Sequence, residues 1–300
     1  MSLKKVITRR QFIKDSSIVT ATVGTALLLG AQESPVLKPA GKSRVVLVRN
    51  QDVLDADGNP KDEVVLEMLD AGVTALTGKK DPVGAWKTIV KPTDIVGIKS
   101  NVWNYLPTTT QVEQALKKRV MDTGVKEASI GIDDRGVIGN PIFQKSTALI
   151  NARPMRSHHW SGVGSLIKNY IMFIPDPLSY HPDSCASLAS IWEKPMVKGK
   201  TRLNVLVMLT PQFHCVGPHS FNPKYVWKYY GLLLGFDPVS VDANGLRIIE
   251  AIRKGYFAED RPLDPPAKHI AIADTRYHLG TADPAKIELI KIGYDKDIFI

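Results

Sequence analysis

Cysteine is scarce in this chain of 300 residues, which contains only Cys185 and Cys215. A small disulfide-framework protein is therefore excluded, and so is an iron–sulfur cluster of the chain's own, because such clusters take four thiolates. Long apolar runs are also missing, since no stretch after residue 31 reaches the roughly 18 residues of a membrane span. Arginine-rich runs and alternating aromatic and basic residues are absent too, which argues against nucleic acid as a partner.

The composition that is present is that of a globular protein, with 44% hydrophobic and 23% charged residues. A chain of this length can bury a substantial core. The formal net charge is +9, but residues 1–31 contribute five basic residues and one acidic residue, so the rest of the chain carries +5. That mild excess is typical of a solvated surface rather than of a polyanion-binding face.

The N-terminus resembles a twin-arginine export signal, with the run TRRQFIK at residues 8–14 and isoleucine in the place of the usual leucine. The apolar stretch that follows ends at Ala31, and its 14 residues would cover about 21 Å as a helix. This is short of the ~30 Å hydrocarbon core of a bilayer. We therefore predict a signal peptide over residues 1–31, a linker over 32–42, the Tat translocase as a partner and a periplasmic location. Retention as an N-terminal anchor is the alternative.

Short runs rich in valine and isoleucine alternate with segments of helical period. The predicted strands are Arg44–Arg49, Asp94–Lys99, Glu127–Asp133, Met155–His159, Leu203–Leu209, Tyr229–Leu234, Ile270–Ala273 and Ile287–Ile292. The predicted helices are Lys61–Leu76, Gln111–Thr123, Val163–Tyr170, Cys185–Glu193 and Pro238–Lys254, the last capped by Asp237. The alternation predicts one α/β domain over residues 43–300, with a largely parallel or mixed sheet and helices on both faces.

Polar residues gather where predicted strands end, which is where α/β sheets place their ligands. Lys99 and Asn101 end one strand, and Thr109 precedes the next helix, so we expect an anion-binding cradle there. The alternative is a lysine paired with a surface acid and a threonine that caps the helix. Asp133 and Asp134 end another strand and could bind a metal or act as acid and base. Because neighbouring strand residues point to opposite faces, at most one of them should face a site.

Four segments together resemble the domain-of-unknown-function family 362. They are GIKSN at 97–101 with the threonines at 108–110, SHH at 157–159 with Lys168-Asn169, Gly217-Pro218, and DPVSVDA at 237–243. The resemblance runs from about residue 43 to 295 and implies a shared pocket formed by Lys99, Asn101, His158, Lys168, Asn169 and Asp242. It implies a fold and a site pattern but no particular reaction. Many members are associated with ferredoxin-like iron–sulfur modules, and this chain departs from them by lacking the cysteines.

Seven of the nine histidines and cysteines crowd into about a fifth of the chain. Imidazole and thiolate together suit a transition metal, although no standard zinc spacing is present. We predict that His214 and His219 converge with His159 and Cys215. Two alternatives stay open: a disulfide between Cys185 and Cys215, which would close a loop of about 31 residues, and unpaired structural cysteines.

These observations favour an exported, redox-linked enzyme that acts on a small anionic ligand. His158 would carry the proton, because the pKa of imidazole is near neutral. Lys99 and Lys168 would hold the anion, and Asp133 or Asp134 would orient the histidine or hold a metal. The second hypothesis is a non-catalytic protein that carries a metal or ligand to a periplasmic redox partner. An enzyme would turn its ligand over, whereas a carrier would return it unchanged.

Overall fold

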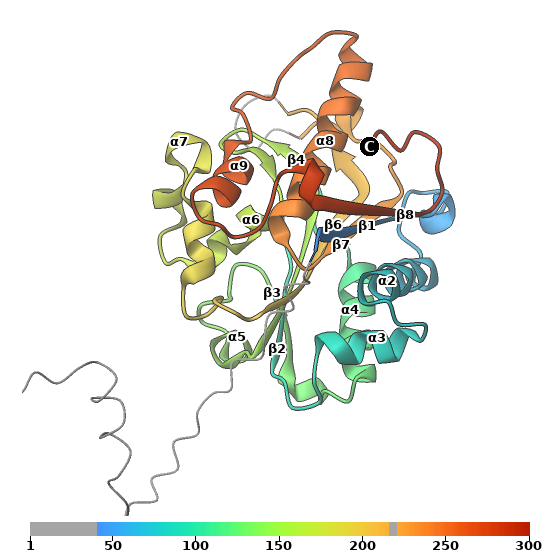
Figure 1. The fold of residues 1–300 in the computed structure, drawn as a ribbon, viewed down its shortest axis with the longest axis vertical. Coiled ribbons are helices and arrows are strands. Elements are labelled where there is room, and N and C mark those ends of the chain that lie inside the picture. The colour runs from blue at the N-terminus through green and yellow to red at the C-terminus, as the bar shows by residue number, and fades with distance from the viewer. Residues whose placement is uncertain (1–40, 216–220) are drawn as a thin grey trace, which may run out of the picture. The chain divides into compact units, whose positions relative to one another are not determined.

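The computed structural model describes residues 41–215 and 221–300. Within these ranges the strands form one mixed sheet in the order β3-β2-β4-β6-β7-β1-β8, with the short β5 paired to β4 (Figure 1). Their bounds are β1 Ser43–Arg49, β2 Val96–Lys99, β3 Ile130–Asp133, β4 Ala148–His158, β5 Gly162–Gly164, β6 Thr201–Gln212, β7 Gly231–Gly235 and β8 Ile287–Gly293. Strands β3, β2, β4 and β6 are mutually parallel, whereas β7 runs antiparallel between β6 and β1. The predicted α/β fold is confirmed.

Helices cover both faces of this sheet (Figure 1). One face carries α2 Asp62–Thr77, α3 Pro82–Ile89 and α4 Thr110–Asp122. The other carries α5 Pro141–Lys145, α6 Leu166–Asn169, α7 Pro182–Cys185, α8 Pro238–Phe257 and α9 Lys268–Thr275. Short 3-10 helices lie at Gln51–Val53, Glu127–Ser129, Tyr170–Phe173, Pro177–Tyr180, Leu188–Glu193, Pro223–Tyr225 and Pro284–Lys286.

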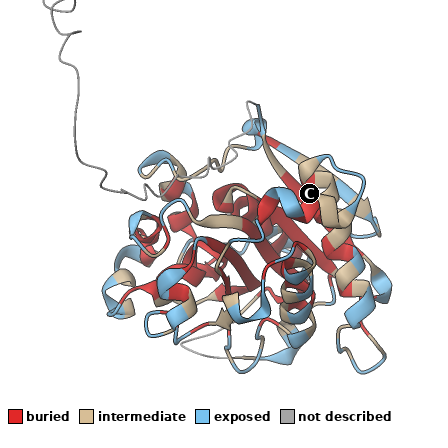
Figure 2. Cartoon of the chain, turned by 90° about the horizontal axis from the view of Figure 1, so that it is seen from below, coloured by how far each residue is buried: buried red, intermediate tan, exposed pale blue. Residues whose placement is uncertain are grey.

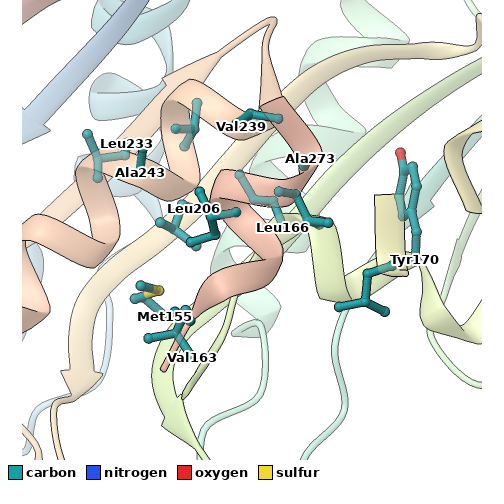
Figure 3. Packing of buried hydrophobic residues seen from close by; sticks show 14 of the residues in the cluster. Met155, Val163, Leu166, Tyr170, Leu206, Leu233, Val239, Ala243 and Ala273 are labelled. Carbon is teal, nitrogen blue, oxygen red and sulfur yellow. The ribbon is translucent and has the colours of Figure 1, made fainter. Parts of the chain in front are cut away.

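Strand alternation divides the hydrophobic core into two layers. In β1, Val46 and Val48 pack toward α2 and α4, whereas Val45 and Leu47 pack toward α8. The central strands are buried on both sides, as strands covered by helices on both faces must be (Figure 2). In the second layer Leu206 of β6 packs with residues of α6, α8 and α9 (Figure 3). This packing holds the short helix α6, which contains Lys168, in place.

The start of α8 was predicted correctly. Asp237 accepts hydrogen bonds from the backbone N–H groups of Val239 and Ser240, at 2.8 and 3.2 Å, and Pro238 occupies the first turn. The helix continues three residues past the predicted end, to Phe257. The proline-rich connection that leads to α9 contains no helix or strand.

Several predicted elements were wrong. Ile270–Ala273 belongs to helix α9, because a four-residue apolar run does not distinguish a strand from a buried helix segment. Val163–Tyr170 contains β5, α6 and the start of a 3-10 helix rather than one helix. Cys185–Glu193 contains the end of α7 and a separate 3-10 helix. Strand β4 begins at Ala148, seven residues before the predicted start at Met155.

The predicted signal peptide, Gly217-Pro218 and His219 lie outside the described residues, so the export route stays a prediction. In residues 41–215 and 221–300, no helix has the length and apolar character needed to cross a bilayer.

Candidate functional site

A pocket of about 240 Å³ opens beside the carboxyl ends of the parallel strands β2, β3 and β4. This is the edge of the sheet at which ligands bind in open α/β folds. Its lining is strongly basic, with four cationic side chains and one carboxylate, namely Arg135, Arg153, Arg156, Lys168 and Asp134. We call this cavity the basic pocket.

Arg153 is the most unusual residue of the basic pocket. Its side chain comes from the buried part of β4 and is 3% exposed. Within the described ranges no carboxylate pairs with it, and its Nε has no hydrogen-bond partner. Burial lowers the pKa of Arg153 to about 10, so the guanidinium stays charged at neutral pH. Gly164 of β5 makes room for it, since a Cβ there would lie 2.6 Å from the Arg153 Nη2.

A second buried guanidinium lies three residues further along β4. Arg156 Nη1 donates to Asn101 Oδ1 at 3.1 Å, and the guanidinium lies over the Trp103 ring at 4.3 Å from its centroid. The carbonyl and the ring hold Arg156 without neutralising it, because neither carries a negative charge. Burial, and then the nearby Arg153, lower the pKa of Arg156. Asn101 and Trp103 therefore position a cation at the pocket wall.

Lys168 reaches the same pocket from α6. Its Nζ lies 3.6 Å from Cys185 Sγ, and no carboxylate among the described residues pairs with it. Burial lowers the pKa of Lys168 to about 8, and the charges of Arg153 and Arg156 act in the same direction. Burial raises the pKa of the Cys185 thiol, so the sulfur remains protonated and does not supply a counter-charge. At neutral pH a fraction of Lys168 is therefore an uncharged amine.

Three histidines, His158, His159 and His181, complete the lining. The backbone N–H of Trp160 donates to His158 Nδ1 at 3.2 Å, so the ring proton of neutral His158 lies on Nε2. Burial, and then Lys168, lower the pKa of His158 well below its usual value. The same causes lower the pKa of His181 to about 4. Near neutral pH the rings of His158 and His181 are therefore uncharged.

Lys99 lies behind the pocket and forms an ion pair with Asp134. Its Nζ also donates to Ser100 O at 2.7 Å and to Asn169 Oδ1 at 3.3 Å. Burial lowers the pKa of Lys99 to about 8, against the opposing effect of Asp134. Lys99 thus joins two residues that line the pocket, Asp134 and Asn169, and it holds the ends of β2 and β3 to α6.

Asp242 anchors α6 from within α8 and is completely buried. It accepts hydrogen bonds from Ser165 Oγ and from the backbone N–H groups of Leu166 and Ile167, at 2.7, 2.9 and 2.8 Å. These are the free donors of the first turn of α6, the helix that carries Lys168. Burial raises the pKa of Asp242 to about 6 despite these hydrogen bonds. Asp242 is therefore a positioning residue.

Besides Lys99 and Asp242, which were expected to form the pocket but do not line it, Asp133 and Thr109 also take other positions. Asp133 accepts from Gly136 N at 2.9 Å and from Asn140 Nδ2 at 3.0 Å, which closes the turn after β3. Its neighbour Asp134 faces the pocket instead, because successive residues along a strand point to opposite faces of the sheet. Thr109 occupies the N-cap position of α4, and its hydroxyl makes no hydrogen bond within the described residues.

The predicted metal centre is not assembled by the described residues. His214 Nδ1 lies 3.0 Å from Arg253 Nη1, and its ring packs edge-on against Tyr225 and Phe257. His159 and Cys215 line the basic pocket, but no group of three His, Cys, Asp or Glu side chains in residues 41–215 and 221–300 could hold a metal ion. Cys185 and Cys215 are both free thiols, so the disulfide alternative is wrong for this structure.

Arg153 and Arg156 were missed by the sequence reasoning. The predicted strand began at Met155, which left Arg153 outside it and treated Arg156 as an ordinary strand residue. The signal was present as two arginines inside the run ALINARPMRSH at residues 148–158, next to a buried asparagine. Charged residues are almost never buried without a partner, so arginines within a central strand mark a site.

Comparison of the chain with protein-family models, curated proteins and solved structures finds no significant match. The resemblance to family 362 therefore stays a prediction that rests on the motifs alone, and the argument for function rests on the basic pocket.

Proposed function

We propose that the protein is an enzyme that binds a small anionic molecule in the basic pocket. The observation that carries this proposal is Arg153, a buried guanidinium that faces the pocket and has no acidic partner among the described residues. The charges of Asp134 and Asp242 act on Arg153 from a distance without forming an ion pair with it, and a buried charge that lacks a paired counter-charge costs several kcal/mol. A bound carboxylate or phosphate would offset that cost by forming charge-assisted hydrogen bonds with Arg153.

The chemistry around Arg153 supports an enzyme rather than a simple carrier. His158 presents Nε2–H as a neutral donor, and Lys168 has a pKa of about 8. Groups with strongly shifted pKa values that converge in one cavity are typical of acid–base sites. The small volume of the pocket, about 240 Å³, favours a ligand of a few carbon atoms over a nucleotide.

Replacing Arg153 with glutamine tests this proposal. We expect the wild-type protein to bind oxalate, pyruvate, sulfate or phosphate in calorimetric titrations, and the variant to bind the same anion roughly 10- to 150-fold more weakly, because a charge-assisted hydrogen bond contributes about 1.5–3 kcal/mol. We also expect the variant to be more stable than the wild type in anion-free buffer, since it removes a buried unpaired charge.

The control is Arg276→Gln, which changes an exposed arginine that does not line the pocket. It should leave both anion affinity and stability unchanged. The proposal is wrong if no anion binds, if uncharged amides such as oxamide bind as tightly as the acids, or if Arg153→Gln retains wild-type affinity.

A further inference from the structure

We infer that Lys168 is a covalent nucleophile and that the anionic molecule of the basic pocket is a 2-oxo acid, whose carbonyl carbon forms a Schiff base with Lys168 Nζ. This inference rests on the proposed function, because the carboxylate of the substrate is held by the arginines of that pocket. It assigns a reaction, imine formation, and a substrate class, the 2-oxo acids, to the basic pocket.

The amine of Lys168 lies inside the basic pocket. Lys168 is the only lysine among the described residues that line the pocket, and it is 3% exposed. Its Nζ contacts the thiol of Cys185, at 3.6 Å from Nζ to Sγ. An amine held by a neutral thiol, in a cavity shared with two guanidinium groups, is poorly stabilised as an ammonium ion. Desolvated lysines beside other cations are the ones that react as free amines.

Lys99 shows by contrast what a structural lysine looks like in the same region. It is also completely buried, yet Asp134 neutralises it, and its remaining N–H groups donate hydrogen bonds to Ser100 O and Asn169 Oδ1. All three N–H directions of Lys99 are therefore used by the protein. Among residues 41–215 and 221–300, the hydrogen-bond partner of Lys168 Nζ is the Cys185 thiol alone, so its other N–H directions are available to a ligand.

The charge balance around a bound substrate also favours a reactive amine. A carboxylate between Arg153 and Arg156 would neutralise only one of the two guanidinium charges. The remaining charge continues to oppose protonation of Lys168, so a monoanion leaves the amine reactive. A 2-oxo acid places its carbonyl carbon next to the carboxylate, which lets one small molecule contact the arginines and the lysine together.

The step needs no oxidant, reductant or metal. The lone pair of neutral Nζ forms a bond to the carbonyl carbon, and the π electrons of the C=O bond move to the oxygen, which takes a proton from water. Nζ gives up two protons in turn, one to the hydroxide left by that water and one, through solvent, to the hydroxyl group, which leaves as water as the C=N bond forms. The sum is one amine and one carbonyl giving one imine and one water.

Reductive trapping tests the inference. The protein is incubated with pyruvate and sodium cyanoborohydride, which delivers hydride to the imine carbon and leaves a stable secondary amine. We expect one adduct per chain by intact mass spectrometry, located on Lys168 by peptide mapping of the wild-type protein. Oxalate should suppress the adduct by occupying the arginines, and lactate, which carries a hydroxyl in place of the 2-oxo group, should give none. The initial rate should rise roughly tenfold between pH 7 and pH 9, as Lys168 loses its proton.

Lys168→Arg keeps the charge of the side chain and should abolish the adduct. The mapping of wild-type protein makes the test independent of whether that variant folds. If anions bind in calorimetry but pyruvate gives no adduct on Lys168, this inference is wrong and the proposed function stands. If none of these anions binds and none protects Lys168, both are wrong.

Discussion

Replacing Asp242 with alanine is expected to lower the free energy of unfolding by about 3–5 kcal/mol, because it removes a buried acceptor and leaves its donors unpaired. The donors are Ser165 Oγ and the backbone N–H groups of Leu166 and Ile167, all at the start of α6. Because α6 also carries Lys168, we expect the remaining folded protein to lose anion binding and pyruvate trapping as well. Urea denaturation at pH 7 and trapping at low temperature measure the two effects.

Asp237→Ala is the matched control, because Asp237 caps α8 as Asp242 caps α6. Asp237 is half-buried, accepts from the backbone N–H groups of Val239, Ser240 and Thr281 and from the hydroxyls of Ser43 and Ser240, and is not among the residues of the basic pocket. Its loss should cost about 1–2 kcal/mol, in the range of N-cap substitutions, and should leave trapping at Lys168 intact. If Asp242→Ala keeps wild-type trapping, α6 is not positioned by Asp242.

The second large effect is expected from Asp134→Asn, which leaves the buried Lys99 without its counter-charge. We expect a loss of about 3–5 kcal/mol at pH 7, as for other broken buried ion pairs. Without Asp134 the pKa of Lys99 falls further below its value of about 8 in the wild-type protein. The unfolded chain, with a lysine pKa near about 10.4, then binds more protons than the folded one, so stability rises with pH. In the variant this gain begins at a lower pH than in the wild type, so the loss relative to the wild type should shrink as the pH rises toward about 8 and stay constant above it.

Two further variants separate this effect from a general loss of structure. Lys99→Met combined with Asp134→Asn removes both charges and should recover at least half of the lost stability at pH 7. Glu127→Gln breaks the exposed pair between Lys117 and Glu127 and should change stability by less than about 1 kcal/mol. A pH-independent loss in Asp134→Asn would show that Lys99 is not the source of the instability.

The sequence predicted the layout of the fold because long, strongly patterned segments carry most of that information. Strand β1, helix α2 and helix α8 were located to within three residues at each end. Several short elements were predicted wrongly, because a short apolar run fits both the two-residue period of a strand and the 3.6-residue period of a helix. The run at Ile270–Ala273 was predicted as a strand, and only its packing against α8 makes it part of a helix.

The site was partly predictable for a similar reason. Residues that follow strand ends, such as Asn101 and His158, were found because parallel strands end at one edge of a sheet. Arg153 was not found, because its burial depends on β5, which folds back and pairs with β4. No pattern in the sequence of β4 alone indicates that pairing. The role of Asp242 was also hidden, since its partners in α6 lie more than 70 residues away in sequence.

The central claim is that Arg153 is a buried cation whose partner is a bound anion. A crystal structure of the full chain soaked in bromide, with anomalous data collected at the bromine edge, tests it most directly. We predict a bromide peak inside the basic pocket, in contact with the guanidinium of Arg153, and loss of that peak when oxalate is added. A structure in which Arg153 instead forms an ion pair with a carboxylate of the protein, with no bromide in the pocket, would contradict the account.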